Sequence, residues 1–130
     1  MLLPNIRDRP PTGRSISDAL SQVMQQVDFH CFADIQSQRS DPLYKELCLI
    51  IAEVFLLDPE SVININGSLT PLRLIQDIYM HLRHDHVRAV FENFQNVASR
   101  IYNKKAYLRT ALYNIVFEIE SHYAKEHFAD

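Results

Sequence analysis

Hydrophobic residues recur along most of the chain at steps of three and four, the spacing that places side chains on one face of an α-helix. The longest such stripe lies near the C-terminal end of the sequence. It runs through Leu108, Leu112, Ile115, Ile119 and Tyr123. Asn103 precedes the stripe in the position of an N-cap, because its short side chain can accept a hydrogen bond from a free helix N–H. The pattern predicts a long helix within residues 101–123 on which the rest of the chain packs.

The first part of the chain shows shorter versions of the same spacing. Ser17 is the expected N-cap of a helix whose apolar face spans Leu20 to Val27. A second short helix is expected over Phe29–Ile35, followed by a polar loop over Gln36–Ser40. Asp41-Pro42 then combines a capping side chain with a proline suited to the first helical position.

The middle of the chain repeats these signals. The helix that starts at Asp41-Pro42 carries an apolar face as far as Phe55, and Asp58-Pro59 is expected to end it. Thr70-Pro71 is expected to open the next helix as Asp41-Pro42 does. A turn at residues 83–85 then leads, with Asp85 as N-cap, into a helix that ends near Val97.

One stretch breaks the helical spacing. From Ser61 to Thr70 the β-branched residues Val62, Ile63 and Ile65 alternate with asparagines. They are followed by Asn66-Gly67, a pair that tolerates the positive φ angles of a tight hairpin turn. The pattern predicts a two-stranded hairpin that depends on neighbouring helices for its stability.

Together these elements predict an all-α fold, a compact bundle of five or six helices with one short β-hairpin insertion. The 130 residues, 47% hydrophobic with two glycines, suit one globular domain. Residues 1–15, rich in proline, are expected to form a flexible arm or linker before a single helical domain over residues 16–130.

Charge is uneven along the chain, although the net charge is only −3. Residues 71–110 hold seven basic and three acidic residues, whereas residues 1–70 hold five and nine. Within the basic part, one cluster lies at the predicted start of the last long helix. It consists of Arg100, Lys104, Lys105 and Arg109, with Tyr102 between them.

This cluster has two interpretations. Lysines in a first helical turn oppose the helix dipole, which hints at an anionic partner, and free N–H groups there favour phosphate. Tyr102 and Tyr107 could stack on bases. Alternatively, the cluster is an ordinary solvated helix start whose tyrosines belong to the core. Asn114, next to the apolar stripe, is expected to satisfy a neighbouring backbone group, for example in the hairpin.

No catalytic or metal motif stands out. His81, His84 and His86 lie close together around Asp85, but they lack a fourth ligand at a defined spacing, so surface or capping roles are expected. Serines lack a nucleophile context, carboxylates are not paired, and no glycine-rich phosphate loop is present. The sequence predicts a protein that is not an enzyme and needs no cofactor.

The two cysteines and the hydropathy of the chain indicate the cellular location to expect for the protein. Cys48 lies among aliphatic residues and is expected to be buried, and with Cys31 it makes neither a zinc motif nor a disulfide framework. No apolar run has membrane-spanning length and no signal-peptide pattern begins the sequence, so a reducing, cytoplasmic location without membrane contact is the default expectation.

From about residue 61 to residue 123 the chain resembles a domain of unknown function found in replication proteins of Gram-positive plasmids, conjugative elements and phages. In that family the domain commonly lies C-terminal to a RepA-type replication-initiator winged helix. Four motifs carry the resemblance, of which the last two are the most distinctive. They are Ile65–Gly67, Asp85–Val90, Ile101–Asn103 and Ala106–Asn114.

The chain departs from the family pattern at two points. Lys104 replaces an apolar residue, and Ile115-Val116 replaces an Ala-Pro pair, so the last helix is expected to run on unbroken. The layout is also similar to the DnaD-like helical modules of primosome proteins. The resemblance implies a role in the replication of a mobile element and supplies no catalytic residues.

Two functions are therefore expected. In the first, the domain is an accessory DNA-binding module of a replication initiator that contacts phosphates through the basic cluster. In the second, it is a protein-interaction or self-association module that joins an initiator to a helicase loader or to another copy of itself. Its apolar surface would involve the helix from Leu20 to Val27. Phosphate contacts weaken steeply with salt and apolar contacts do not, which separates the two.

Overall fold

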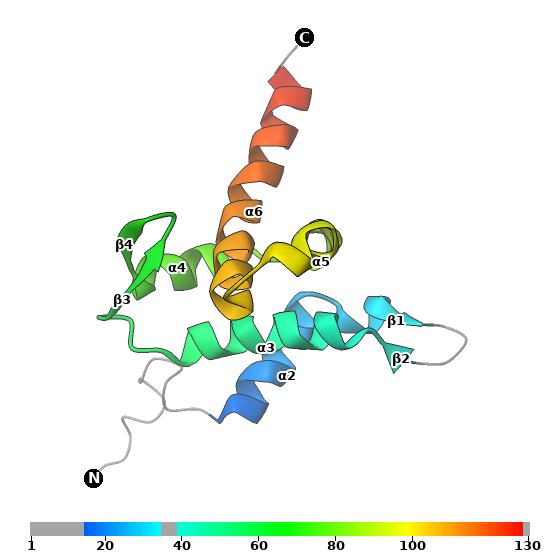
Figure 1. Cartoon of the computed structure of the whole chain (residues 1–130), viewed down its shortest axis with the longest axis horizontal. Coiled ribbons are helices and arrows are strands. Elements are labelled where there is room, and N and C mark those ends of the chain that lie inside the picture. The colour runs from blue at the N-terminus through cyan, green and yellow to red at the C-terminus, as the bar shows by residue number, and fades with distance from the viewer. Residues whose placement is uncertain (1–14, 35–38, 129–130) are drawn as a thin grey trace.

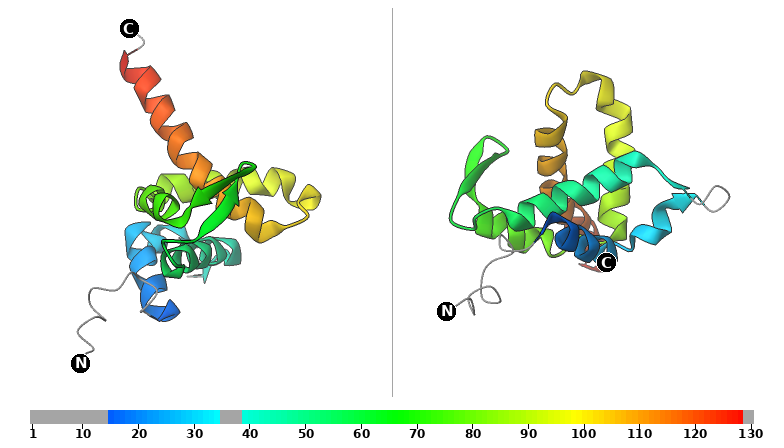
Figure 2. Two further views of the ribbon diagram at one scale, coloured as in Figure 1. Left: turned by 90° about the vertical axis from the view of Figure 1, so that its left-hand side faces the viewer. Right: turned by 90° about the horizontal axis from the view of Figure 1, so that it is seen from below.

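The computed structural model describes the backbone of residues 15–34 and 39–128, and the side chains within 15–31 and 41–120. Five α-helices, two short 3-10 helices and two two-stranded antiparallel ladders make up these residues. The prediction of a helical bundle with an inserted β-hairpin is confirmed. Helix α3 crosses between α2 on one side and α4, α5 and α6 on the other (Figures 1 and 2).

Helix α2 (Ile16–Gln26) begins two residues earlier than the sequence suggested. Ser15, not Ser17, is the N-cap, and its Oγ accepts a hydrogen bond of 3.1 Å from the backbone N–H of Asp18. Both serines have the right side chain, but only Ser15 has the extended backbone of a cap. The apolar face of α2 is buried at Val23 and at Val27, the residue that follows it, and packs against α3. The surface expected to serve a protein partner is therefore part of the core.

The segment after α2 also differs from the prediction. A 3-10 helix covers only Phe29–Phe32, and β1 (Ala33–Asp34) then pairs with β2 (Arg39–Ser40). The predicted helix over Phe29–Ile35 is present only as a 3-10 helix over its first four residues, because Ala33 and Asp34 are extended and form this ladder. Ile35 and residues 36–38 of the predicted loop lie outside the described residues.

Helix α3 (Pro42–Leu56) is the central element. Asp41 caps it through a 2.8 Å hydrogen bond from the N–H of Leu43 to Oδ1, and Pro42 occupies the first turn, as predicted. Six of its residues are buried, on a face broad enough to contact four other helices. They are Leu47, Cys48, Ile50, Ile51, Ala52 and Val54.

The hairpin forms where the sequence places it. Strand β3 (Val62–Ile65) pairs with β4 (Ser68–Pro71), with Ile65 opposite Ser68. Asn66 and Gly67 have φ of 55° and 83°, the values of a turn with two left-handed residues. Ile63 and Ile65 face the helices, and Ile65 is buried.

Two helix starts in the second half differ from the sequence expectation. Helix α4 (Leu72–Tyr79) has Pro71 in the cap position, because Thr70 belongs to β4 and its hydroxyl donates to the Ser68 carbonyl. Helix α5 (His84–Val97) starts after Arg83. Asp85 is therefore not its N-cap but lies in the first turn.

Helix α6 (Lys104–Phe128) follows the short 3-10 helix η3 (Ala98–Arg100) and runs unbroken for 25 residues, as expected. Asn103 caps it, accepting a 3.1 Å hydrogen bond from the N–H of Ala106. Leu108, Leu112 and Ile115 are buried in one core that all five helices share. The last turns of α6 rise beyond the other elements (Figure 1).

Candidate nucleic-acid interface

The capped start of α6 holds the two lysines of the predicted basic cluster against α3. Lys104 Nζ lies 2.8 Å from Glu46 Oε1, and Lys105 Nζ lies 2.8 Å from Glu53 Oε1. The two glutamates are seven residues apart, about two helical turns, so they lie along one side of α3. Lys104 Nζ also lies 5.7 Å from the centroid of the Phe94 ring, within cation–π range. The two lysines therefore fasten the start of α6 to α3, and carboxylates compensate their charge.

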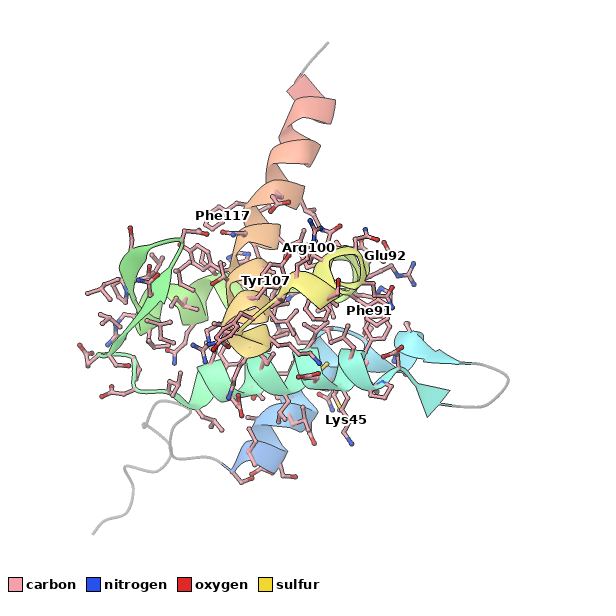
Figure 3. All side chains as sticks on the ribbon, in the orientation of Figure 1. Lys45, Phe91, Glu92, Arg100, Tyr107 and Phe117 are labelled. Carbon is pink, nitrogen blue, oxygen red and sulfur yellow. The ribbon has the colours of Figure 1, made fainter. Side chains whose placement is uncertain are left out.

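The other members of the cluster divide into exposed and half-buried residues. Arg109 is half-buried, and its main-chain carbonyl accepts a 2.7 Å hydrogen bond from the hydroxyl of Tyr79. Arg100 and Tyr102 are exposed on the connection between α5 and α6, Tyr102 to about 104% of its reference area (Figure 3). The structure therefore places all five predicted residues around one helix start, where Tyr102 is fully exposed and no salt bridge to Arg100 is found among the described residues.

Tyr79 is the best-buried polar group near this helix start. Its side chain is fully buried, and burial raises the pKa of its hydroxyl well above the ordinary value. The protonated hydroxyl is what the hydrogen bond to Arg109 requires, because the carbonyl can only accept. Tyr79 thus joins α4 to α6 about one turn after the lysines that join α6 to α3.

Tyr107 and Asn114 have structural partners. The ring of Tyr107 packs on Phe94 with a centroid distance of 5.9 Å. Asn114 exchanges two hydrogen bonds with Asn66 at the hairpin tip, of 2.8 and 3.1 Å. The hairpin was correctly predicted as the partner of Asn114, although the contact is to a side chain and not to the backbone. This side-chain pair fixes the hairpin tip to α6.

One histidine of the cluster, His86, makes a hydrogen bond at the start of α5. His86 Nδ1 accepts a 2.9 Å hydrogen bond from the backbone N–H of Arg83, which leaves one fewer free donor at the start of α5. Burial lowers the pKa of His86, although the Asp85 carboxylate acts in the opposite direction. Within the described part of the chain, no three His, Cys, Asp or Glu side chains are arranged to hold a metal ion.

The cysteines lie apart in two different environments. Cys48 is buried in the core, and desolvation raises the pKa of its thiol to about 12. Cys31 is exposed. The predicted burial of Cys48 is confirmed, and a neutral thiol with so high a pKa is a poor nucleophile.

A comparison with known protein families gives a match that covers nearly the whole chain, including the helix starts and the hairpin described above. The model of a family of unknown function, DUF6017, matches residues 9–130. The chain belongs to the DUF6017 family. No curated protein and no solved structure matches the chain. Among the described residues of this DUF6017 domain, no helix is both long enough and apolar enough to cross a membrane.

The hairpin of this DUF6017 domain has an exposed apolar face that was not predicted from the sequence. Alternation along the strands turns Val62, Leu69 and Pro71 away from the helices, and Val62 and Leu69 are 52% and 73% exposed. A hairpin with one buried face normally carries polar residues on the other. Because Val62 and Ile63 are adjacent and both apolar, the sequence alone does not show which one faces the core.

A second apolar group lies near the hairpin on α6. Phe117 is 47% exposed on the side of α6 that faces the hairpin (Figure 3). Its ring contacts that of Tyr113 at a centroid distance of 5.3 Å. The outer hairpin face is defined as Val62, Leu69 and Pro71, and Phe117 is a separate exposed apolar side chain on α6.

Proposed function

We propose that this domain is a non-enzymatic self-association module, and that two copies meet through the outer hairpin face. The observation that carries the proposal is the exposure of Leu69 and Val62 on the side of the hairpin away from the core. Exposed apolar side chains that are neighbours on one sheet face are typical of interaction surfaces. The open strand edges of a two-stranded ladder also offer backbone groups for pairing.

A second copy is the occupant that suits this face best. The outer face and its flanking Asn64 carry no charge, so two copies of a chain with a net charge of −3 can meet there without placing like charges together. A two-fold axis brings the same patch of each copy together, which makes an apolar face complementary to itself. Because the patch is small compared with a standard interface of about 1,600 Å², we expect weak, concentration-dependent dimers.

The biological setting is proposed from the sequence motifs. The Ile101–Asn103 and Ala106–Asn114 stretches resemble a domain of replication initiators of Gram-positive mobile elements. In that setting, self-association would bring initiator molecules together on DNA, and the same apolar face would be open to other replication proteins. The helical architecture and the membership of DUF6017 are compatible with this proposal.

Sedimentation equilibrium over a wide range of protein concentration tests the self-association. The wild-type domain is expected to form dimers at high concentration, and the double substitution Val62→Ser/Leu69→Ser is expected to keep it monomeric. The matched control is Ile16→Ser/Leu49→Ser, which removes two exposed apolar side chains from α2 and α3 and is expected to leave dimerisation unchanged. A wild-type domain that stays monomeric at the highest concentration would refute the proposal.

DNA binding is the second candidate, favoured by the charge distribution around α6. No Asp or Glu occurs between Glu92 and Glu118, a stretch that contains all four basic residues of the cluster. The exposed Arg100 and Tyr102 provide a cation and an aromatic ring side by side on one connection, a combination used to bind single strands. Two of the four cations are paired with glutamates, so binding is expected to be weak and strongly dependent on salt.

Fluorescence anisotropy of labelled single- and double-stranded DNA at low and moderate salt tests this candidate. Arg100→Glu is expected to abolish binding, whereas Arg73→Glu, a charge reversal on α4 away from the cluster, is expected to change it little. Equal losses from the two substitutions would indicate a general charge effect and would refute a site at the start of α6.

A further inference from the structure

A small cavity between α5 and α6 has no role in the functions proposed above. Its volume is about 160 Å³, room for about five water molecules, and it opens to solvent on one side. The floor is apolar and includes Val90 from α5 and Ile115 from α6, both buried. A cavity of this size accommodates one side chain of a partner and not a whole cofactor.

The walls of the cavity are rich in hydrogen-bond acceptors. Thr110, Asn114 and Glu118 follow one another at steps of four along α6, and Asn93 faces them from α5. A hydroxyl, two amide carbonyls and a carboxylate thus surround the opening. Among the described residues that line the cavity there is no lysine or arginine.

Two of the walls are held in place by contacts already described. The Asn114 amide is fixed by its two hydrogen bonds to Asn66, and each of its polar atoms retains capacity for a further bond. The Tyr107 ring, which also lines the cavity, is supported by its contact with Phe94. The site is therefore largely formed before any ligand arrives, which reduces the cost of binding.

The chemistry of these walls selects the ligand. A phosphate or carboxylate would face Glu118 with no cation to compensate, and a purely apolar group would leave the polar walls without partners. A planar cation with several N–H donors suits both the acceptors and the aromatic ring, because guanidinium groups stack on aromatic faces and pair with carboxylates. We propose that the cavity binds the guanidinium group of an arginine side chain presented by another protein chain. The site is separate from the outer hairpin face and does not depend on self-association.

A titration of the ¹⁵N-labelled domain with N-acetyl-arginine amide, followed by NMR, tests the inference. Saturable shifts are expected at the side-chain amides of Asn93 and Asn114 and at the backbone of Thr110. N-acetyl-lysine amide is expected to bind at least about fivefold more weakly, because its ammonium cannot present a planar fork of donors. Guanosine, which offers a planar set of donors without charge, is the comparison for a nucleobase.

Glu118→Gln removes the carboxylate and is expected to weaken arginine binding about tenfold, as for the loss of a charged hydrogen-bond partner. Glu120→Gln is the matched control, because Glu120 is another exposed glutamate on α6 that does not line the cavity. Equal binding of lysine, tighter binding of guanosine, equal effects of the two substitutions, or no shifts at high ligand concentration would each overturn the assignment. None of these outcomes changes the sedimentation result, so the two proposals fail or stand separately.

Discussion

Replacing Tyr79 by phenylalanine tests the link between α4 and the start of α6. The change removes one hydroxyl and keeps the ring that fills the core, so no cavity forms. The hydroxyl lies in a fully buried side chain and donates a 2.7 Å hydrogen bond to the carbonyl of Arg109. A buried neutral hydrogen bond contributes about 0.5 to 1.5 kcal/mol to stability.

A value near the middle of that range applies here, without the added cost of an unpaired buried carbonyl. The carbonyl of Arg109 lies within α6, so it can also accept the helical hydrogen bond from four residues further along and is not left without a partner. We therefore expect Tyr79→Phe to lower the free energy of unfolding by about 1 kcal/mol. With a urea dependence of about 2 kcal/mol per M, the midpoint of unfolding falls by about 0.5 M.

Urea unfolding followed by circular dichroism measures this shift. Tyr102→Phe is the matched control, since it removes the same hydroxyl from a fully exposed ring and is expected to change stability by less than about 0.5 kcal/mol. If the two substitutions have the same effect, the Tyr79 hydroxyl does not contribute through this hydrogen bond, and the reasoning is refuted.

Three further predictions address charge, protonation and thiol chemistry. The pair between Lys105 and Glu53 is partly exposed, so a double-mutant cycle with alanine at both positions is expected to give a coupling energy of about 0.2 to 1 kcal/mol; a value near zero would show that the pair does not fasten α6 to α3. The pKa of His86 is lowered in the folded chain, so its contribution to stability is present above the ordinary pKa of 6.5 and is lost as the pH falls through the lowered value. Unfolding midpoints measured at several pH values should therefore decrease on acidification, and His86→Gln should reduce that decrease; an unchanged pH profile would contradict the assignment. In the native domain Ellman's reagent should modify Cys31 quickly and Cys48 only after unfolding, and two equally fast thiols would contradict the burial of Cys48.

The features that the sequence predicted well are those set by neighbouring residues. Asp41-Pro42 starts a helix because a cap and its proline act within one turn, and Asn66-Gly67 makes a hairpin turn because both residues accept positive φ. The apolar face of α6 was also predicted from the sequence, since hydrophobic residues at steps of three and four define one helix face. Asp85 shows the limit of this reasoning. It has a good capping side chain, but the helix starts one residue earlier, where His86 reaches back to the Arg83 N–H.

The candidate site depended on contacts between distant parts of the chain. Nothing near Lys104 or Lys105 in the sequence identifies Glu46 and Glu53 as their partners, because α3 and α6 meet only in the folded bundle. The basic residues lie around one helix start, as their positions in the sequence indicate, while the pairing of two of them with carboxylates was not foreseeable. The cavity beside Thr110 was missed for the same reason, since two of its eight lining residues, Val90 and Asn93, belong to another helix.

The hydrogen bonds that hold the hairpin tip also affect a slow chemical change, the deamidation of Asn66. An asparagine followed by glycine is prone to deamidation, in which the glycine N–H attacks the asparagine side chain and a succinimide forms. Here the Gly67 N–H donates a 3.0 Å hydrogen bond to Asn64 Oδ1, and the Asn66 amide is held by Asn114, so both reacting groups are restrained. Once the tip separates from α6 the restraint on the Asn66 amide is lost, and conversion of Asn66 to aspartate or isoaspartate removes the amide donor and disturbs the turn. The hairpin would then no longer bind α6 through this amide pair. The fraction of molecules with deamidated Asn66 would therefore reflect how often the contact had opened.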